Sequence, residues 1–250
     1  MAGALARTAE KQPHLPPRTD LRWQTRCAVC AAGATTVIAY SAHSEPGGHE
    51  DNQDRFEVRS VADSSECYVC AVADGQGGQA GAALAAAIAC QSCLDRVSSF
   101  RTDKLLSPSI WSVVLQDADK AVADTDEAGY TTLIAFCLTQ AMLCGGSSGD
   151  SAVAVINADE PPHILTKHQM KNPPVGSRGA IFVPFSMRLV HPWTVLAMTD
   201  GVWKYAGWDS IFAAASEGDS ETIIRKLRGK SALPRTGALQ DDFTLVVFQG

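Results

Sequence analysis

The stretch CYVCAVADGQGG, residues 67–78, sets the interpretation of the whole chain. Its first seven residues are apolar, and the run ends abruptly at Asp74-Gly75. An apolar run of this length, closed by a glycine-rich turn, is typical of a buried strand. Because Gly75 has no Cβ, a main-chain carbonyl or a ligand can come close to it. The pattern therefore predicts a carboxylate at the end of a rigid strand.

A second stretch, MTDGVW at residues 198–203, repeats this arrangement, with Asp200 directly after the apolar run 194–198. Asp54 precedes a predicted strand, Asp150 lies in a glycine-rich turn and Asp241 starts the last strand. Taken singly, each Asp also fits a turn, where its side chain bonds the local backbone. Gathered together, these carboxylates would repel one another unless cations neutralised them, and oxygen ligands favour Mg²⁺ or Mn²⁺ over zinc.

The rest of the pattern alternates short apolar runs with amphipathic segments. Strands are predicted at 37–40, 56–61, 67–73, 131–139, 152–157, 194–198 and 243–248, and helices at 79–97, 109–124, 208–216 and 221–228. The segment GGSSGDS, residues 145–151, is predicted as a separator, and 167–179 as a long surface loop. This order indicates an α+β fold and does not fit a simple βαβ series.

Composition narrows the class of protein. The 250 residues are 46% hydrophobic and 19% charged, which is typical of a folded globular chain. The net charge of −6 provides no field for a polyanion, so nucleic acid is not expected as a partner. Residues 1–20 are predicted to form a flexible basic extension and residues 21–250 a single domain.

The cysteines raise an alternative function. Without a long apolar segment, the chain is expected to be cytoplasmic, off the membrane, and its eight cysteines to be thiols. Three CxxC spacings, at 27/30, 67/70 and 90/93, would suit a zinc-stabilised interaction module. Cys67 and Cys70, however, would point to opposite faces of one strand and could not bind the same ion. Cys90 and Cys93 would lie on one face of a helix as small residues of the apolar core. The zinc alternative therefore rests mainly on Cys27 and Cys30.

Six ordered motifs resemble those of the PP2C-type (PPM) metal-dependent Ser/Thr protein phosphatases, especially compact bacterial members. They are EDNQDRF (50–56), VADGQGG (72–78), TTLIAF (131–136), GDSAVAVI (149–156), MTDGVW (198–203) and DDFTLVVF (241–248). The resemblance implies a four-layer αββα fold: a central antiparallel β-sandwich, flanked by helices, with a metal cluster at one end.

The same resemblance implies which residues form the site. The catalytic residues would be four aspartates that also bind the metal ions: Asp54, Asp74, Asp200 and Asp241. The carbonyl of Gly75 would be a further metal ligand. Asp74 matches the residue that bridges two ions, Mn²⁺ or Mg²⁺, and Asp150 matches the ligand of a third ion in many members. Asp242 matches the position after the last ligand. The implied reaction is attack of a metal-activated water on phosphoserine or phosphothreonine.

The sequence departs from the family pattern at several positions near these motifs. His49 stands where an Arg usually binds the substrate phosphate, and Lys204 stands where DGxWD has its last Asp. Gln76 stands where eukaryotic members have a His. The main alternative is a pseudophosphatase that binds phosphoproteins or a signalling partner with little turnover. For an active enzyme, the resemblance implies phosphorylated protein substrates and a signalling circuit with a cognate Ser/Thr kinase.

Overall fold

The computed structural model describes residues 24–26, 37–48, 50–61, 66–78, 80–158 and 160–250. The predicted basic extension 1–20, the cysteine pair 27/30 and His49 lie outside this part of the chain. No helix among the described residues has the length and apolar character that crossing a bilayer requires.

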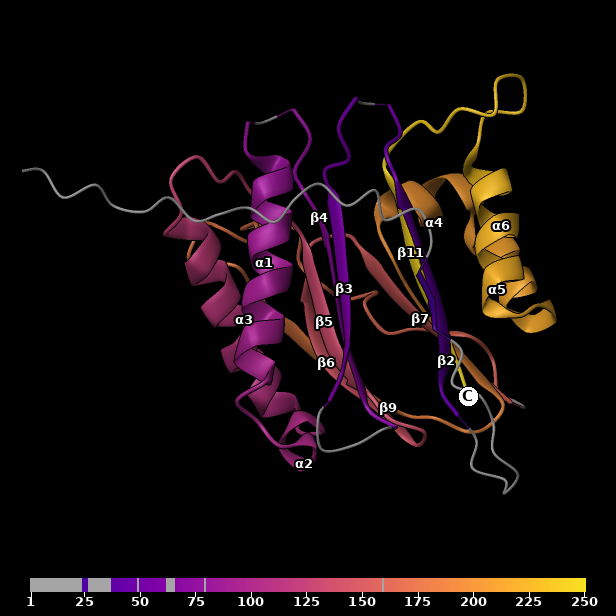
Figure 1. The fold of residues 1–250 in the computed structure, drawn as a ribbon, viewed down its shortest axis with the longest axis horizontal. Coiled ribbons are helices and arrows are strands. Elements are labelled where there is room, and N and C mark those ends of the chain that lie inside the picture. The colour runs from indigo at the N-terminus through magenta and orange to yellow at the C-terminus, as the bar shows by residue number, and fades with distance from the viewer. Residues whose placement is uncertain (1–23, 27–36, 49, 62–65, 79, 159) are drawn as a thin grey trace, which may run out of the picture.

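Two antiparallel sheets stack face to face at the centre of the molecule (Figure 1). The first sheet has six strands, in the order β1 (Gln24–Arg26), β2 (Ala39–Glu45), β11 (Phe243–Gln249), β10 (Trp193–Met198), β7 (Ala152–Asn157) and β8 (His163–Ile164). The second has five, in the order β3 (Asp54–Ser60), β4 (Tyr68–Asp74), β5 (Leu133–Leu138), β6 (Met142–Ser148) and β9 (Val183–Arg188).

Helices cover the outer face of each sheet (Figure 1). The second sheet carries α1 (Ala82–Val97), the short α2 (Thr102–Leu105) and α3 (Pro108–Ala123). The first carries α4 (Asp200–Ala206), α5 (Trp208–Glu217) and α6 (Ser220–Ser231). One apolar core lies between the sheets and one beneath each group of helices. The expected four-layer αββα architecture is therefore confirmed.

The packing of β4 explains why its sequence is apolar throughout. Cys70 and Val72 face the other sheet, whereas alternate residues such as Val69 and Ala71 face the helices. A strand buried on both faces has no polar alternation. Opposite it, α1 presents small buried side chains, which let the helix lie close to the strand: Ala82, Ala85, Ala86, Ala89, Cys90 and Cys93. Cys67 and Cys70 lie in different cores, as predicted.

Several strands differ from the sequence-based expectation. β2 runs on to Glu45, β9 was not predicted, and β6 includes the glycines and serines interpreted as a separator. These glycines serve packing. A Cβ on Gly145 would lie 2.5 Å from that of Phe136, its partner on β5, and a Cβ on Gly146 would lie 2.7 Å from Leu115 Cδ1 of α3. The missing side chains let neighbouring groups approach the strand closely.

This packing predicts opposite effects for two Gly→Ala substitutions. Gly145→Ala places a methyl group against β5 backbone, so we expect the free energy of unfolding to fall by about 1–3 kcal/mol. Gly229→Ala, in exposed α6, meets no neighbour within 4 Å and should stabilise by about 0.5–1 kcal/mol, since Ala is the better helix former. Urea denaturation measures both. A Gly145→Ala protein as stable as the wild type would contradict the packing argument.

Candidate metal centre

Two aspartates face each other across one rung of a β-ladder. Asp54 is the first residue of β3, Asp74 is the last of β4, and the two are direct partners in the register. Phe56 on β3 and Val72 on β4, each two residues from its aspartate, point into the core between the sheets. Residues two apart on a strand share a face. Both carboxylates therefore lie on the inner face of the second sheet, at one end of the sandwich.

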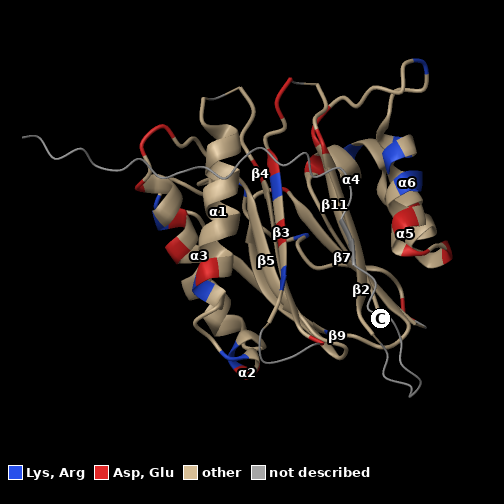
Figure 2. Ribbon diagram, in the orientation of Figure 1, with Lys and Arg blue, Asp and Glu red and all other residues tan. Residues whose placement is uncertain are grey.

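Three more acidic residues reach the same end from other elements. Asp200 begins α4 directly after β10, Asp241 precedes β11, and Asp150 lies in the turn between β6 and β7. Figure 2 shows acidic residues at this end, where β3, β4, β11 and α4 meet. Asp74, Asp150 and Asp200 each offer a carboxylate oxygen, and the three oxygens lie within 4.8 Å of one another.

Hydroxyl groups from neighbouring strands fix the two opposed aspartates. The Thr199 hydroxyl donates to Asp54 Oδ2 at 2.7 Å. The backbone N–H of Asp74 donates to Thr132 Oγ1 at 2.9 Å, and that hydroxyl is 2.8 Å from Ser151 Oγ. These three hydroxyl groups therefore hold the side chain of Asp54 and the backbone of Asp74 in place.

Asp242 has a different task from its neighbour Asp241. Its carboxylate accepts the backbone N–H of Gly47 at 2.8 Å and that of Gln53 at 2.6 Å. Asp242 is buried, and both of its oxygens are engaged by these bonds. It therefore ties the β2–β3 connection to the start of β11, and so places Asp54 relative to Asp241.

Two glycines allow the main chain to close around the site. A Cβ on Gly75 would lie 2.5 Å from the carbonyl oxygen of Ala82, where α1 begins. A Cβ on Gly201 would overlap the carbonyl oxygen of Asp242. The glycine after each aspartate, noted in the sequence, is thus required by close backbone approach.

The carboxylates disfavour their own ionisation. Burial, together with the negative charge of neighbouring aspartates, raises the pKa of Asp54 and that of Asp74 far above their usual range. Burial and the charge of Asp200 also raise the pKa of Asp241. An assembly of buried oxygen donors with unbalanced negative charge fits a hard divalent cation, Mg²⁺ or Mn²⁺.

Two lysines touch the outer side of this cluster. The Lys204 ammonium forms an ion pair with Asp200 and lies 3.9 Å from Asp150, and the Lys171 ammonium lies 2.5 Å from Asp150. Burial alone would lower the pKa of Lys204, but the hydrogen bond and charge of Asp200, with the charge of Asp150, raise it. Lys204 therefore stays cationic at neutral pH.

The three cationic side chains of the predicted surface loop 167–179 have different surroundings. Lys171 reaches the site, whereas Arg178 forms an ion pair with Asp124 at the end of α3. Asp119, buried in α3, accepts the backbone N–H of Gly176 at 2.6 Å and so holds the loop against that helix. Of the cations in this loop, Lys171 is the one that contacts the acidic cluster.

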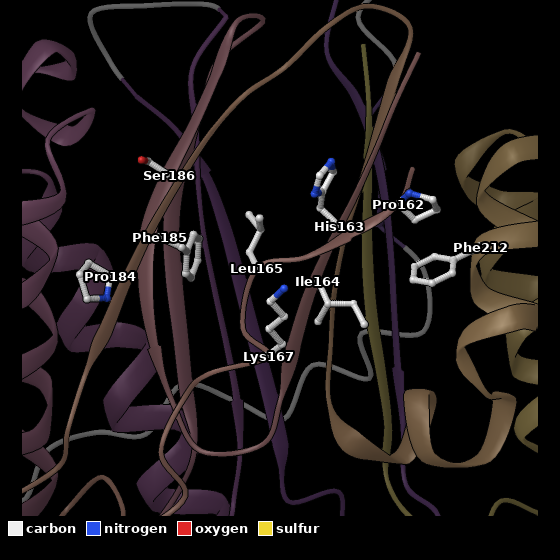
Figure 3. A pocket seen from close by; sticks show the side chains of 9 residues that line it. All are labelled: Pro162, His163, Ile164, Leu165, Lys167, Pro184, Phe185, Ser186 and Phe212. Atoms are coloured by element: carbon white, nitrogen blue, oxygen red, sulfur yellow. The ribbon is translucent and has the colours of Figure 1, made fainter. Parts of the chain in front are cut away.

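Lys167 instead lines a separate pocket of about 540 Å³ between strands β8 and β9, the outer strands of the two sheets (Figure 3). Its walls combine polar and apolar groups, and the apolar ones include Ile164, Phe185 and Phe212. None of the predicted metal ligands lines it. The pocket is therefore separate from the acidic cluster.

The structure brings Asp54, Asp74, Gly75, Asp150, Asp200 and Asp241 to one end of the sandwich. Sequence reasoning did not find the contacts of Thr132, Thr199 and the two lysines. The "TD" pair at 199–200 was the available signal for Thr199.

Within the described part of the chain, the other histidines and cysteines form no second centre. His43 lies buried on β2, with Nε2 3.3 Å from Glu45 Oε1. The described cysteines are buried thiols outside any disulfide, and no described group of Cys and His residues could hold zinc.

A sandwich of two sheets between helices, with clustered carboxylates at one end, defines a metal-dependent hydrolase fold and site. Residues 44–218 match the family model described as protein phosphatase 2C. The chain therefore belongs to the protein phosphatase 2C family of metal-dependent protein Ser/Thr phosphatases. The matched segment holds Asp54, Asp74, Asp150 and Asp200, whereas Asp241 lies beyond it. No comparison supports the pseudophosphatase alternative.

Solved structures share this fold at low sequence identity. RsbX in complex with magnesium is 14% identical, with a TM-score of 0.67 over 91% of this chain and 98% of that one. The catalytic domain of the Ser/Thr phosphatase PstP with two manganese ions is 19% identical, with a TM-score of 0.68 over 85% and 98%. PppA, a regulatory component of the T6SS in Pseudomonas aeruginosa, is 16% identical, with a TM-score of 0.64 over 85% and 97%. No curated protein matches the sequence.

The raised pKa values predict how stability of the metal-stripped protein depends on pH. The folded state retains protons on Asp54 and Asp74 that the unfolded chain releases, so the free energy of unfolding should fall as pH rises from about 5 to about 8. One such group alone changes the free energy of unfolding by about 1.4 kcal/mol per pH unit in this range, so we expect a loss of about 4 kcal/mol or more, or about 8–16 °C in Tm. Carboxylates with lowered pKa, such as Asp219, lose their contribution only at lower pH.

Thermal denaturation in EDTA measures this dependence, and Mn²⁺ should restore stability most at pH 8. Asp54→Asn should make the pH profile shallower, because the amide does not titrate and Asp74 alone then supplies the remaining dependence. Asp95→Asn, on exposed α1 surface, should leave the profile unchanged. A stripped wild-type protein that is as stable at pH 8 as at pH 5 would contradict the argument.

Proposed function

We propose that this phosphatase hydrolyses phosphoserine and phosphothreonine in proteins at the end of the sandwich, with two divalent cations held by its aspartates. The observation that carries the proposal is the convergence of the Asp74, Asp150 and Asp200 carboxylates to within 4.8 Å in a chain of this family. The single domain that performs this reaction would comprise residues 21–250.

Each protein ligand has a role that follows from its position. Asp74 is the ladder partner of Asp54, and its carboxylate lies within 4.8 Å of that of Asp200, which would suit a ligand shared by two ions. Asp54, the carbonyl of Gly75, Asp200 and Asp241 would complete the two coordination sets. Because these groups stand at the ends of β-strands and at the start of α4, they are held in a nearly fixed geometry before any ion binds.

The chemistry combines metal activation with positioning. Two divalent cations bound here would lower the pKa of a shared water and polarise the phosphoryl oxygens. The Thr199 hydroxyl, by donating to Asp54 Oδ2, fixes the orientation of that carboxylate within the acidic cluster. The chain itself therefore supplies geometry and negative charge, and the reaction needs no covalent phosphoenzyme.

His49 is proposed to contact the substrate phosphate. It belongs to the connection between β2 and β3, whose flanking residues Gly47 and Gln53 are bound by the Asp242 carboxylate beside Asp241. The described parts of this connection are therefore held beside Asp241. Histidine offers one charged donor at low pH, whereas arginine would offer a permanent bidentate fork.

We further propose that the substrates are phosphoproteins of a signalling circuit in which a cognate Ser/Thr kinase adds the phosphate. The free thiols among the described cysteines suit the reducing cytoplasm.

Loss of either Asp74 or Asp200 should abolish turnover. Replacing one of these carboxylates by Asn removes a charged ligand, so hydrolysis of a phosphothreonine peptide with Mn²⁺ should fall by about 10³-fold or more. Folding should survive, because the substitution relieves repulsion between buried carboxylates. Phosphate release and thermal denaturation measure the two effects.

Asp209→Asn serves as the matched control, since Asp209 is exposed on α5 and outside the acidic cluster. It should retain wild-type turnover. A folded Asp74→Asn protein with wild-type activity would refute the assignment of the site.

His49→Arg should lower KM for phosphopeptides by about tenfold at pH 8. The gain should shrink toward pH 6, because histidine in water is protonated below about pH 6.5 and would then carry the same charge as Arg. Steady-state kinetics at both pH values measure this difference. His191→Arg, an exposed site at the opposite end of β10, is the control and should change neither value. An unchanged KM for His49→Arg at both pH values would remove His49 from the phosphate site.

A further inference from the structure

The side of the acidic cluster formed by Asp150 and Asp200 already holds positive charge. The Lys204 ammonium forms an ion pair with Asp200 and lies 3.9 Å from Asp150. The Lys171 ammonium lies 2.5 Å from the same oxygen of Asp150. Asp54 and Asp74, on the other side, have no described ion pair with a lysine or arginine.

Lys204 is placed by the helix on which it lies. Asp200 and Lys204 are four residues apart on α4 and so share one helix face. The next contact fixes the helix against the Asp150 turn, because Trp203 Nε1 donates to the Asp150 carbonyl oxygen at 2.9 Å. Lys204 Nζ also lies 5.8 Å from the centre of the Trp203 ring. The ammonium therefore sits over Asp150 through contacts that do not depend on the metal ligands alone.

Burial distinguishes the two lysines. The side chains of Asp200 and Asp150 are 11% and 21% exposed, that of Lys204 is 40% exposed and that of Lys171 is 65% exposed. Lys204 lies closer to the cluster, and Lys171 closes it from the solvent side. Together they bring two positive charges to this pair of carboxylates, which equals the charge of one divalent cation.

We propose that Lys204, with Lys171, takes the place of a third divalent cation at Asp150, so that this phosphatase binds two ions and not three. The inference rests on the proposed two-ion site. A cation approaching between Asp150 and Asp200 would be repelled by both ammonium groups and would find these carboxylate oxygens engaged. Asp150 then acts as an anchor for two lysines and not as a metal ligand.

The experiment counts bound Mn²⁺ in EDTA-stripped protein by isothermal titration calorimetry and by electron paramagnetic resonance of the free ion. We expect two ions per wild-type chain. Lys204→Asp exchanges the ammonium for a carboxylate beside Asp150 and Asp200, and should add a third ion with millimolar affinity. Lys204→Met removes the charge without adding a ligand, and should leave a weaker third site or none. Circular dichroism establishes that each variant is folded.

Lys120→Asp provides the matched control. Lys120 also pairs with an aspartate four residues away, Asp124 on α3, but outside the acidic cluster. The control should bind two ions, as the wild type does.

The outcomes separate the two proposals. A wild-type protein that binds no Mn²⁺ overturns the two-ion centre itself. Three ions in the wild type, or only two in a folded Lys204→Asp protein, overturn the role of Lys204 and leave the two-ion centre standing. Two ions in the wild type and three in Lys204→Asp support both.

Discussion

Repulsion between Asp54 and Asp74 is the constraint on which the rest of the site depends. Their backbones are paired on one rung of the β3–β4 ladder, so their carboxylates cannot separate without breaking the sheet. Burial and charge raise the pKa of both groups, and a cation between them is the simplest relief. The strands thus hold the two carboxyl groups together until an ion takes the place of their protons.

The surrounding residues keep this unfavourable arrangement intact. Thr199 and Thr132 engage the side chain of Asp54 and the backbone of Asp74, and Asp242 uses both of its oxygens on backbone N–H groups. The apolar layers beneath supply the stability that offsets the repulsion, since β4 is buried on both faces. The packing of apolar side chains along the sandwich thus offsets the cost of crowding carboxylates at its end.

Much of the site could be predicted because its aspartates stand at the ends of apolar runs. Asp74 and Asp200 each follow a strand and precede a glycine, so strand ends and carboxylates could be located together. The contacts of Lys171 with Asp150 could not, because they join residues from different loops. The spacing of residues along the sequence does not indicate a contact between two loops.

The strand errors have a physical cause as well. β2 alternates apolar and polar residues, and its polar side chains face α6, where they find partners: Ser41 Oγ lies 2.7 Å from Ser220 Oγ, and Glu45 accepts from Arg228 at 2.7 Å. A buried polar face with satisfied hydrogen bonds looks, in sequence, like an exposed loop. β6 was obscured in the same way by the glycines that its packing requires.

The place of β11 in the first sheet has a consequence for how the enzyme comes into being. This strand follows every other described element in the chain, yet it lies between β2 and β10 and is preceded by Asp241 and Asp242. Until it inserts, the β2–β3 connection lacks its anchor, Asp242, and the acidic cluster lacks Asp241. A ribosome-bound chain that has not yet released these residues therefore has no complete centre, and catalytic competence arrives in one late, long-range step.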